Sequence, residues 1–277
     1  MSTATKAVPE GKYAELGDGL RIHYHDVGEG TPILFLHGSG PGASGWSNFR
    51  HNFPHFAAHG YRTIVADTLG YGYSSKPDDR DYTLDWLVGN VRTFLAVLGV
   101  ERCAVVGNSH GGAMAIKLAL DHPNVVDKLV LMAPGGLESR ETYMNMDGIK
   151  AMMKAFFGKE GITRETMRRV FELQLFDPRL VNEELLEERV QIANLQPKRV
   201  LSSMQVPNLA TELSRLRCPT FALWGVDDKY CPVSGAMTIA KECPGSRVLL
   251  LSQCGHWVMV EHAALFNRLC LDFLKEG

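Results

Sequence analysis

A serine flanked by glycines stands at the end of an apolar run, in the stretch VVGNSHGGAM at positions 105–114. The spacing Gly107-x-Ser109-x-Gly111 is typical of a sharp turn between a strand and a helix, which holds the serine in strained geometry with its hydroxyl projecting outward. Glycine is expected on both sides because a Cβ there would collide with the turn. A plain glycine-rich loop would carry the same letters, so the interpretation depends on the rest of the chain.

A serine hydroxyl becomes a nucleophile only when a base takes its proton and a carboxylate orients that base. Two later segments supply such groups, because Asp227 and Asp228 follow the apolar run TFALWG, and His256 follows RVLLLS. The order Ser109, Asp228, His256 is the chain order of the α/β-hydrolase triad. Asp227 stays the alternative acid, because a pattern cannot separate adjacent carboxylates.

A catalytic serine also needs hydrogen-bond donors for the negative charge that develops on the attacked oxygen. The turn HGSGPG at 37–42 directly follows the first strong apolar run and could present a backbone N–H. In this fold a second donor is the N–H of the residue after the nucleophile, which is His110 here. Four signals in the right chain order therefore predict an active hydrolase site.

The elements that must position these groups alternate in type along the chain. Short, almost wholly apolar runs predict strands, and the longer stretches between them predict helices. The expected strands are 32–37, 63–67, 103–107, 128–133, 220–225 and 247–252, and the expected helices are 47–59, 84–98, 111–122, 233–241 and 263–275. This pattern indicates a mostly parallel sheet with helices on both faces, in which ligands bind at the strand ends that carry the predicted residues.

The alternation stops after residue 136. From 137 to 206 the chain reads as amphipathic helix, as in DGIKAMMKAFFG and TRETMRRVFELQLF, and the strand pattern resumes after Cys218. We therefore expect an α/β-hydrolase core formed by 1–136 and 207–277, interrupted by a helical lid at 137–206.

Charge and composition exclude several classes of protein. The 277 residues carry a net charge of −2 and no run rich in Lys or Arg, which argues against a nucleic-acid partner. No stretch of about 18 apolar residues could span a membrane, and the N-terminal stretch lacks a signal-peptide pattern. The six cysteines are scattered without metal-ligand spacing. A cytoplasmic enzyme without a membrane partner, metal or cofactor is expected.

Three histidines offer one alternative to that expectation. His51, His55 and His59 recur every fourth residue, a spacing that on one helix could hold a metal ion. Pro54 interrupts the pattern and no carboxylate joins it, so a solvated helix face is the preferred interpretation.

With these residues in view, the chain resembles one family, the meta-cleavage product hydrolases of bacterial aromatic degradation. The resemblance covers about residues 28–274 and rests on LHGSGPGASGWSNF, VVGNSHGG, LMAPGGL, WGVDDKYCP and CGHWVMVEHAALFNRLCLDFL. It implies hydrolysis of a carbon–carbon bond in a 2-hydroxy-6-oxohexa-2,4-dienoate, giving 2-hydroxypenta-2,4-dienoate and a carboxylic acid. The insertion, rich in Met and Phe, is similar to the biphenyl-pathway branch, which favours an aryl group at C6. A homo-oligomer is also expected.

The resemblance implies roles for single residues. It matches Ser109, Asp228 and His256 to the family nucleophile, acid and base, and Ser39 and Gly40 to the loop that holds the oxyanion. The substrate contacts that it implies are Asn48, Asn108, Trp257 and the insertion arginine Arg189, which would face the dienoate end.

The implied reaction uses these groups in order. The dienol must first ketonise, so His256 would carry a proton to C5 while Arg189 and Asn108 hold the carboxylate and the C2 oxygen. The C6 carbonyl then becomes an electrophile for Ser109, with its oxyanion on the amides of His110 and Ser39. Arg189 has a second interpretation, as an exposed arginine on a helix.

The sequence departs from the family pattern in a few places. The stretch VQIANLQP lacks the usual aromatic residues, Gln174 and Arg179 lie where relatives vary, and His110 replaces the methionine, leucine or phenylalanine of many relatives. These departures bear on the size of the pocket and not on the chemistry. A carboxylesterase of the same fold is the alternative enzyme, and a non-catalytic small-molecule receptor is the alternative from a different class.

Overall fold

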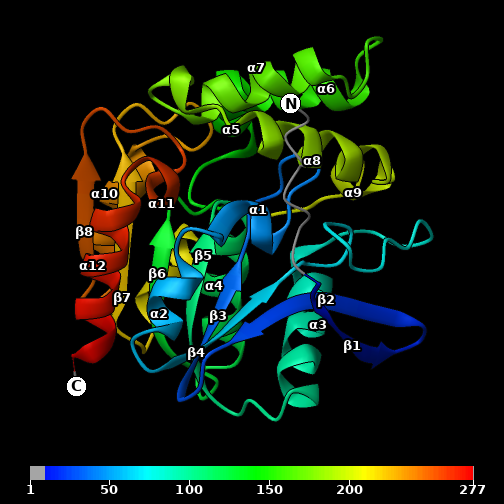
Figure 1. Ribbon diagram of the computed structural model, residues 1–277. Coiled ribbons are helices and arrows are strands. Elements are labelled where there is room, and N and C mark those ends of the chain that lie inside the picture. The colour runs from blue at the N-terminus through cyan, green and yellow to red at the C-terminus, as the bar shows by residue number, and fades with distance from the viewer. Residues whose placement is uncertain (1–9, 277) are drawn as a thin grey trace.

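Eight strands form one sheet in the computed structural model, which describes residues 10–276 (Figure 1). Along the sheet the strands lie in the order β1-β2-β4-β3-β5-β6-β7-β8. Strand β2 is antiparallel to both β1 and β4, and all other neighbours are parallel. The strands are β1 (Lys12–Gly17), β2 (Leu20–Val27), β3 (Thr31–Leu36), β4 (Tyr61–Ala66), β5 (Cys103–Asn108), β6 (Val126–Met132), β7 (Thr220–Gly225) and β8 (Arg247–Leu251). The fold is the expected α/β-hydrolase fold with a mostly parallel sheet.

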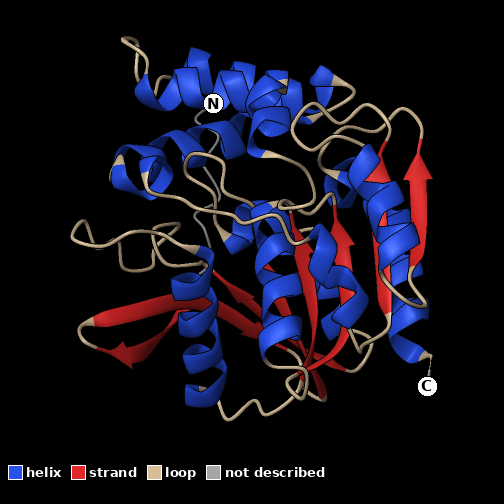
Figure 2. Cartoon of the chain, turned by 180° about the vertical axis from the view of Figure 1, so that it is seen from behind, coloured by secondary structure: helices blue, strands red, loops and turns tan. Residues whose placement is uncertain are grey.

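Helices cover both faces of this sheet (Figure 2). One face carries α3 (Leu84–Val97), α4 (His110–Asp121) and α10 (Ser234–Glu242), which share one buried apolar cluster. The other face carries α1 (Gly45–Phe49), α2 (Phe53–Ala57), α11 (Val258–Glu261) and α12 (Ala263–Lys275), which contribute to a second buried cluster. A short 3-10 helix, η2 (Ala210–Arg215), packs against α10.

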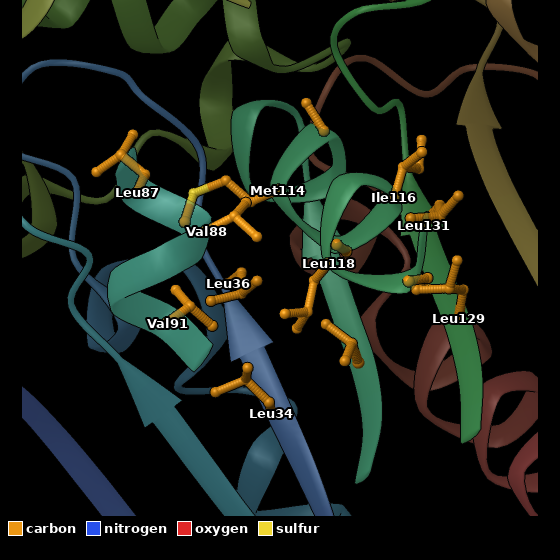
Figure 3. Packing of buried hydrophobic residues seen from close by; sticks show 14 of the residues in the cluster. Leu34, Leu36, Leu87, Val88, Val91, Met114, Ile116, Leu118, Leu129 and Leu131 are labelled. Atoms are coloured by element: carbon orange, nitrogen blue, oxygen red, sulfur yellow. The ribbon is translucent and has the colours of Figure 1, made fainter. Parts of the chain in front are cut away.

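Strand β3 shows why the central strands read as unbroken apolar runs. Leu34 and Leu36 belong to the cluster on one face of the sheet, whereas Ile33 and Phe35 belong to the cluster on the other face. In Figure 3, Leu34 and Leu36 lie across from Val88 and Val91 of α3. Each such fully buried side chain contributes about 1.5–3 kcal/mol to stability, so these strands hold the site on a rigid base.

A layer of helices lies above the carboxyl ends of the parallel strands, at the top of Figure 1. It occupies the chain between β6 and β7 and consists of α5 (Arg140–Asn145), α6 (Asp147–Phe157), α7 (Arg164–Gln174), η1 (Pro178–Leu180), α8 (Glu183–Asn194) and α9 (Arg199–Ser202). We call these helices the lid. They fall in the interval where the sequence predicts a helical insertion, while the exact domain boundaries stay a prediction.

One expectation about local structure is wrong, and one hairpin has no counterpart among the predicted elements. The helix expected over 47–59 is two short helices, α1 and α2, because Pro54 lies in the first turn of α2 and a new helix begins after Asn52. The hairpin of β1 and β2 was not expected at all. Strand β1 is mostly exposed, and the buried run of β2 at 22–25 contains His23 and His25, so neither strand reads as an apolar run. The hairpin turns through Gly17, Asp18 and Gly19, all with positive φ.

Within residues 10–276, no helix combines the length and the apolar character that crossing a lipid bilayer requires.

Candidate active site

Ser109 lies at the turn between β5 and α4, with φ 56° and ψ −118°. A positive φ is strained for a serine, and the surrounding close packing holds it there. A Cβ on Gly107 would come within 2.5 Å of the carbonyl oxygen of Gly111, and a Cβ on Gly111 would come within 2.1 Å of that of Leu36. The two glycines of the motif are therefore required by backbone contacts, and the loop interpretation is wrong.

The two candidate acids differ sharply in position. Oδ2 of Asp228 lies 2.8 Å from Nδ1 of His256, and both side chains are buried. Oδ1 of Asp228 accepts the backbone N–H groups of Tyr230 at 2.7 Å and Cys231 at 3.0 Å. Asp227 is exposed to solvent. Three donors therefore hold the Asp228 carboxylate against the imidazole, and Asp227 has no such position.

The imidazole of His256 is held on several sides. Its backbone N–H donates to the carbonyl of Gln174 at 2.8 Å, and its ring stacks on that of Tyr230 at 5.1 Å between centroids. Among the described residues, no hydrogen bond joins the ring of His256 to the hydroxyl of Ser109. Such bonds often tighten only when substrate is present.

The expected oxyanion loop lies against the nucleophile turn. A Cβ on Gly38 would lie 3.3 Å from both Oδ1 of Asn108 and Cβ of Ser109. His37 anchors this loop, because its Nδ1 donates to the carbonyl of Gly38 at 2.7 Å and its Nε2 accepts the N–H of Thr68 at 3.0 Å. Burial lowers the pKa of His37 to about 4, so the ring is neutral when it makes these bonds.

Arg189, on α8, is 1% exposed, so the interpretation as a surface arginine is wrong. Its Nε donates to the carbonyl of Pro41 at 2.9 Å and its Nη1 to Oγ of Ser47 at 3.3 Å. The guanidinium also lies over the rings of Phe171 at 5.3 Å and Trp257 at 5.8 Å. Burial lowers the pKa of Arg189 to about 10, which still leaves it positively charged at neutral pH.

The charge of Arg189 has no carboxylate partner among the described residues. Its neighbour in sequence, Glu188, pairs instead with Arg50 at 3.8 Å. Burying an ion is costly unless an opposite charge or a full set of hydrogen bonds compensates it. The environment of Arg189 is therefore suited to receive an anion.

Two asparagines line the same small cavity as this cation and the serine. Nδ2 of Asn48 donates to Oδ1 of Asn108 at 3.2 Å, and Nδ2 of Asn108 donates to the carbonyl of Met132 at 3.2 Å. These bonds fix the orientation of both amides. They leave Oδ1 of Asn48 buried without a hydrogen-bond partner in the described part of the chain.

Ser109 lies between two cavities of different character. The smaller cavity, about 20 Å³, has polar groups on one part of its wall and Ile149, Met152 and Trp257 on another. It brings together seven of the predicted site residues: Ser39, Gly40, Asn48, Asn108, Ser109, Arg189 and Trp257. The larger cavity, about 520 Å³, also contains Ser39, Ser109 and His110 and extends beneath the lid. Asp228 and His256 line neither cavity.

Methionine dominates the apolar wall of the larger cavity. Met144, Met152 and Met153 come from the lid, and Met204 follows it. Burial also lowers the pKa of His110 to about 4, and neither of its ring nitrogens has a hydrogen-bond partner among residues 10–276. Its imidazole is therefore a neutral group at the serine end of this cavity.

The structure adds site residues that sequence reasoning missed. Tyr230 stacks on His256, and its hydroxyl donates to the carbonyl of Val170 in the lid at 2.7 Å. Glu261 accepts the N–H of Gly255 at 2.8 Å and that of Phe176 at 2.6 Å. The only feature of the sequence that could have indicated these two residues is their closeness to the triad. Tyr230 lies two residues after Asp228, and Glu261 lies five residues after His256.

No group of three or more His, Cys, Asp or Glu residues that could hold a metal ion occurs in the described range. The rings of His55 and His59 lie 4.3 Å apart on and just after α2.

Known hydrolases are similar to this chain both in sequence and in fold. Residues 31–263 match the family model described as the alpha/beta hydrolase fold. The chain is 36% identical, over 93% of its length and 92% of the relative's, to a 2-hydroxy-6-oxononadienedioate/2-hydroxy-6-oxononatrienedioate hydrolase of Comamonas testosteroni. It is 35% identical, with the same coverage, to a 2-hydroxy-6-oxo-6-phenylhexa-2,4-dienoate hydrolase of Burkholderia cepacia. A solved meta-cleavage product hydrolase from Pseudomonas fluorescens superposes with a TM-score of 0.84 at 29% identity, covering 95% of this chain and 97% of that one.

Proposed function

This chain belongs to the meta-cleavage product hydrolases of the α/β-hydrolase fold, and on that premise we propose that it hydrolyses the C5–C6 bond of a 2-hydroxy-6-oxohexa-2,4-dienoate with an aryl group at C6. The products are 2-hydroxypenta-2,4-dienoate and a carboxylic acid such as benzoate. The observation that carries the proposal is Arg189, a buried cation without a carboxylate partner among the described residues, in the same small cavity as Ser109.

The charge of Arg189 separates this activity from that of an ordinary carboxylesterase. A dienoate brings its own carboxylate, and a guanidinium can bind a carboxylate through two parallel hydrogen bonds. An ester of a neutral alcohol and a simple acid brings no anion, so it would leave the guanidinium uncompensated. Asn48 and Asn108 supply amide groups next to this cation for the C2 oxygen.

In the proposed reaction, His256 transfers the proton of the C2 hydroxyl to C5, which turns the dienol into its keto form. Asp228 holds His256 in the required tautomer and stabilises it when it carries the proton. Arg189 keeps the carboxylate in place while negative charge moves onto the C2 oxygen. This step comes first because C6 is not electrophilic enough while it is conjugated to the dienolate.

The second half of the reaction is acyl chemistry. The oxygen of Ser109, or a water molecule that it assists, adds to C6, and the amides of His110 and Ser39 bind the oxyanion. When the tetrahedral centre collapses, the electrons of the C5–C6 bond pass to C5 and on to the C2 oxygen, which regains a proton. One water molecule is consumed, and its oxygen leaves in the carboxylic acid.

The larger cavity supports an aryl group at C6. Its volume of about 520 Å³ exceeds what a methyl group needs, and its methionines form a pliable apolar wall. The two named relatives differ here, since one is named for a phenyl substrate and the other for a dioate. The charged residues that line the cavity are two acids and one arginine, Asp85, Glu138 and Arg140, a set that does not favour a second carboxylate.

A substrate panel tests the proposal. Purified enzyme is mixed with the 6-phenyl and 6-methyl dienoates and with the nonadienedioate, and the loss of dienolate absorbance is followed. We expect the 6-phenyl compound to have the highest kcat/KM, by at least about tenfold, which corresponds to about 1.4 kcal/mol of extra apolar contact in the transition state. A preference for the dioate would overturn the aryl assignment, and no turnover of any dienoate would overturn the proposed function.

Binding without turnover gives a second test. The Ser109→Ala variant keeps Arg189, the two asparagines and the oxyanion amides, so it should bind the 6-phenyl dienoate, shift its absorbance and then stall. A spectrum that stays equal to that of free substrate at saturating protein would favour the esterase.

A further inference from the structure

Gln174 is a buried polar residue that the proposed mechanism leaves unused. It is the last residue of α7, its side chain is 5% exposed, and its Oε1 has no hydrogen-bond partner among the described residues. A buried amide group without a partner costs about 1–3 kcal/mol. Such a group is best explained when a ligand supplies the missing partner.

The position of this side chain identifies the ligand. Gln174 lines the small polar cavity together with Arg189, Asn48, Asn108 and Ser109. It does not line the larger cavity that is assigned above to the C6 group. The small cavity thus contains a cation and three carboxamides, and two of the carboxamide oxygens, those of Asn48 and Gln174, lack partners in the described part of the chain.

We propose that Gln174 is a specificity-determining residue whose carboxamide hydrogen-bonds the carboxylate and C2-oxygen end of the dienoate. The proposal rests on the proposed function, because it assigns a further contact to the same substrate. A carboxamide suits this end because rotation about its last bond presents either an N–H donor or an oxygen acceptor. It can donate to the carboxylate or accept from the C2 hydroxyl, and it can donate to the C2 oxygen once the hydroxyl proton has moved to C5.

The backbone around Gln174 holds the side chain in place. Its carbonyl accepts the N–H of His256 at 2.8 Å, and two residues later the N–H of Phe176 donates to Glu261 at 2.6 Å. The carbonyl of Gln174 also lies close to Gly255, where a Cβ would approach it to 2.6 Å. The residue that contacts the dienoate is therefore joined through its backbone to the loop that carries the base, so its Cα is fixed relative to His256 before the substrate binds.

The test compares Gln174→Met, which keeps the length of the side chain without polar atoms, with Gln174→Glu, which adds a negative charge. Losing one hydrogen bond to a charged group should lower kcat/KM for the 6-phenyl dienoate about 10- to 100-fold. Gln174→Glu should lose more, because its carboxylate would repel that of the substrate. A neutral nitrophenyl ester, which has no carboxylate, should lose far less in both variants.

Product inhibition locates the contact on the substrate. In Gln174→Met, inhibition by 2-hydroxypenta-2,4-dienoate should weaken about tenfold or more, while inhibition by benzoate should change less than about twofold. The matched control is Gln191→Met, which removes an exposed lid glutamine whose Nε2 donates to Glu187 at 3.3 Å. This control should match the unmodified enzyme in every assay.

Three results would overturn the proposal. Equal losses on the ester and the dienoate, with a lowered Tm, would make Gln174 a structural residue. Weaker inhibition by benzoate instead of the dienoate product would place its contact at the C6 end. Unchanged kinetics in both variants would mean that it contacts no substrate. A failure of the proposed function is distinct from all three, because the unmodified enzyme itself would then not consume the dienoate.

Discussion

Arg189 and Asp228 are the two charged residues whose burial decides how the site works. Arg189 is surrounded by a carbonyl, a hydroxyl and two aromatic rings, and no carboxylate of the described residues forms a salt bridge with it. Asp228 has the opposite arrangement, because its carboxylate accepts three hydrogen bonds from within the fold. The guanidinium of Arg189 can therefore bind the negative charge of a ligand, whereas the carboxylate of Asp228 is occupied in holding His256.

Removing the guanidinium should therefore affect charged substrates selectively. We expect Arg189→Ala to lower kcat/KM for the dienoate about 10- to 150-fold, the value of one charge-assisted, bidentate contact. A neutral nitrophenyl ester should lose much less. Steady-state kinetics on both substrates measure the difference. The control is Arg179→Ala in the same lid, because Arg179 is exposed and pairs only with Asp177. Equal losses on both substrates would show that Arg189 is structural.

The neighbouring acids give a matched pair of variants. Asp228→Asn should lower kcat by about 10²–10⁴, because the amide no longer favours the tautomer and charge that His256 needs. Asp227→Asn should stay within about twofold of the unmodified enzyme, since Asp227 is exposed and an exposed charge contributes little. Single-turnover and steady-state assays on the 6-phenyl dienoate distinguish the two. A damaging Asp227→Asn would refute the assignment of the acid.

At the scale of elements, the base and the lid are connected through one side chain. Glu261, at the end of α11, accepts one N–H from the His256 loop and one from the segment after α7. Burial raises the pKa of Glu261, although both backbone donors favour its charged form. The carboxylate acts as a clamp, so the position of the base depends on that of the lid.

Weakening this clamp should increase the mobility of both the His256 loop and the segment after α7. Glu261→Gln keeps the shape, but its single carbonyl oxygen cannot replace two carboxylate oxygens, so one N–H loses its acceptor. We expect kcat/KM to fall about 5- to 20-fold, in line with the loss of one charged hydrogen bond. Hydrogen exchange should increase at both 174–177 and 254–257. Glu187→Gln is the control, because Glu187 is an exposed lid glutamate whose partners, Arg164 and Gln191, belong to the lid as well. Exchange that increases at one segment alone would contradict the clamp.

At the scale of the whole molecule, two buried histidines link stability to pH. Burial lowers the pKa of both His37 and His110 to about 4, against 6.5 for an exposed histidine. Between these values the unfolded chain binds protons that the folded chain does not. The free energy of unfolding must therefore fall as the pH drops from about 6.5 toward 4.

A pKa shift of this size lowers the free energy of unfolding by about 3 kcal/mol for each histidine as the pH drops from about 6.5 to 4. Urea unfolding at pH 7, 6 and 5 should show the decline, and His37 and His110 together should account for up to two of the protons taken up on unfolding. His110→Met should reduce the uptake by about one proton, because it removes one of the two groups. The control is His122→Gln, because His122 is partly exposed. This variant should leave the dependence of the free energy of unfolding on pH unchanged. A slope that His110→Met does not alter would refute this origin of the pH dependence.

The sequence by itself determined the features that depend on residues close together in the chain. The pattern of strand, glycine, serine and glycine over 103–111 predicts the strained turn, and a Cβ on Gly107 is excluded by the carbonyl of Gly111 in the same turn. The apolar strands and the helical insertion are likewise visible from neighbouring residues. The order of Ser109, Asp228 and His256 can be read from the chain directly. Periodicity missed the β1–β2 hairpin, since the edge strand β1 is mostly exposed and the buried run of β2 contains the polar residues His23 and His25.

The tertiary structure alone decided what depends on packing between distant segments. No pattern separates Asp227 from Asp228, because the choice rests on a histidine 28 residues away. The burial of Arg189 depends on a loop 148 residues before it. The burial of Gln174 depends on how the lid meets the His256 loop. The physical reason is that a side chain's charge and hydrogen bonds are set by what surrounds it, and the surroundings of a lid residue come from the rest of the fold.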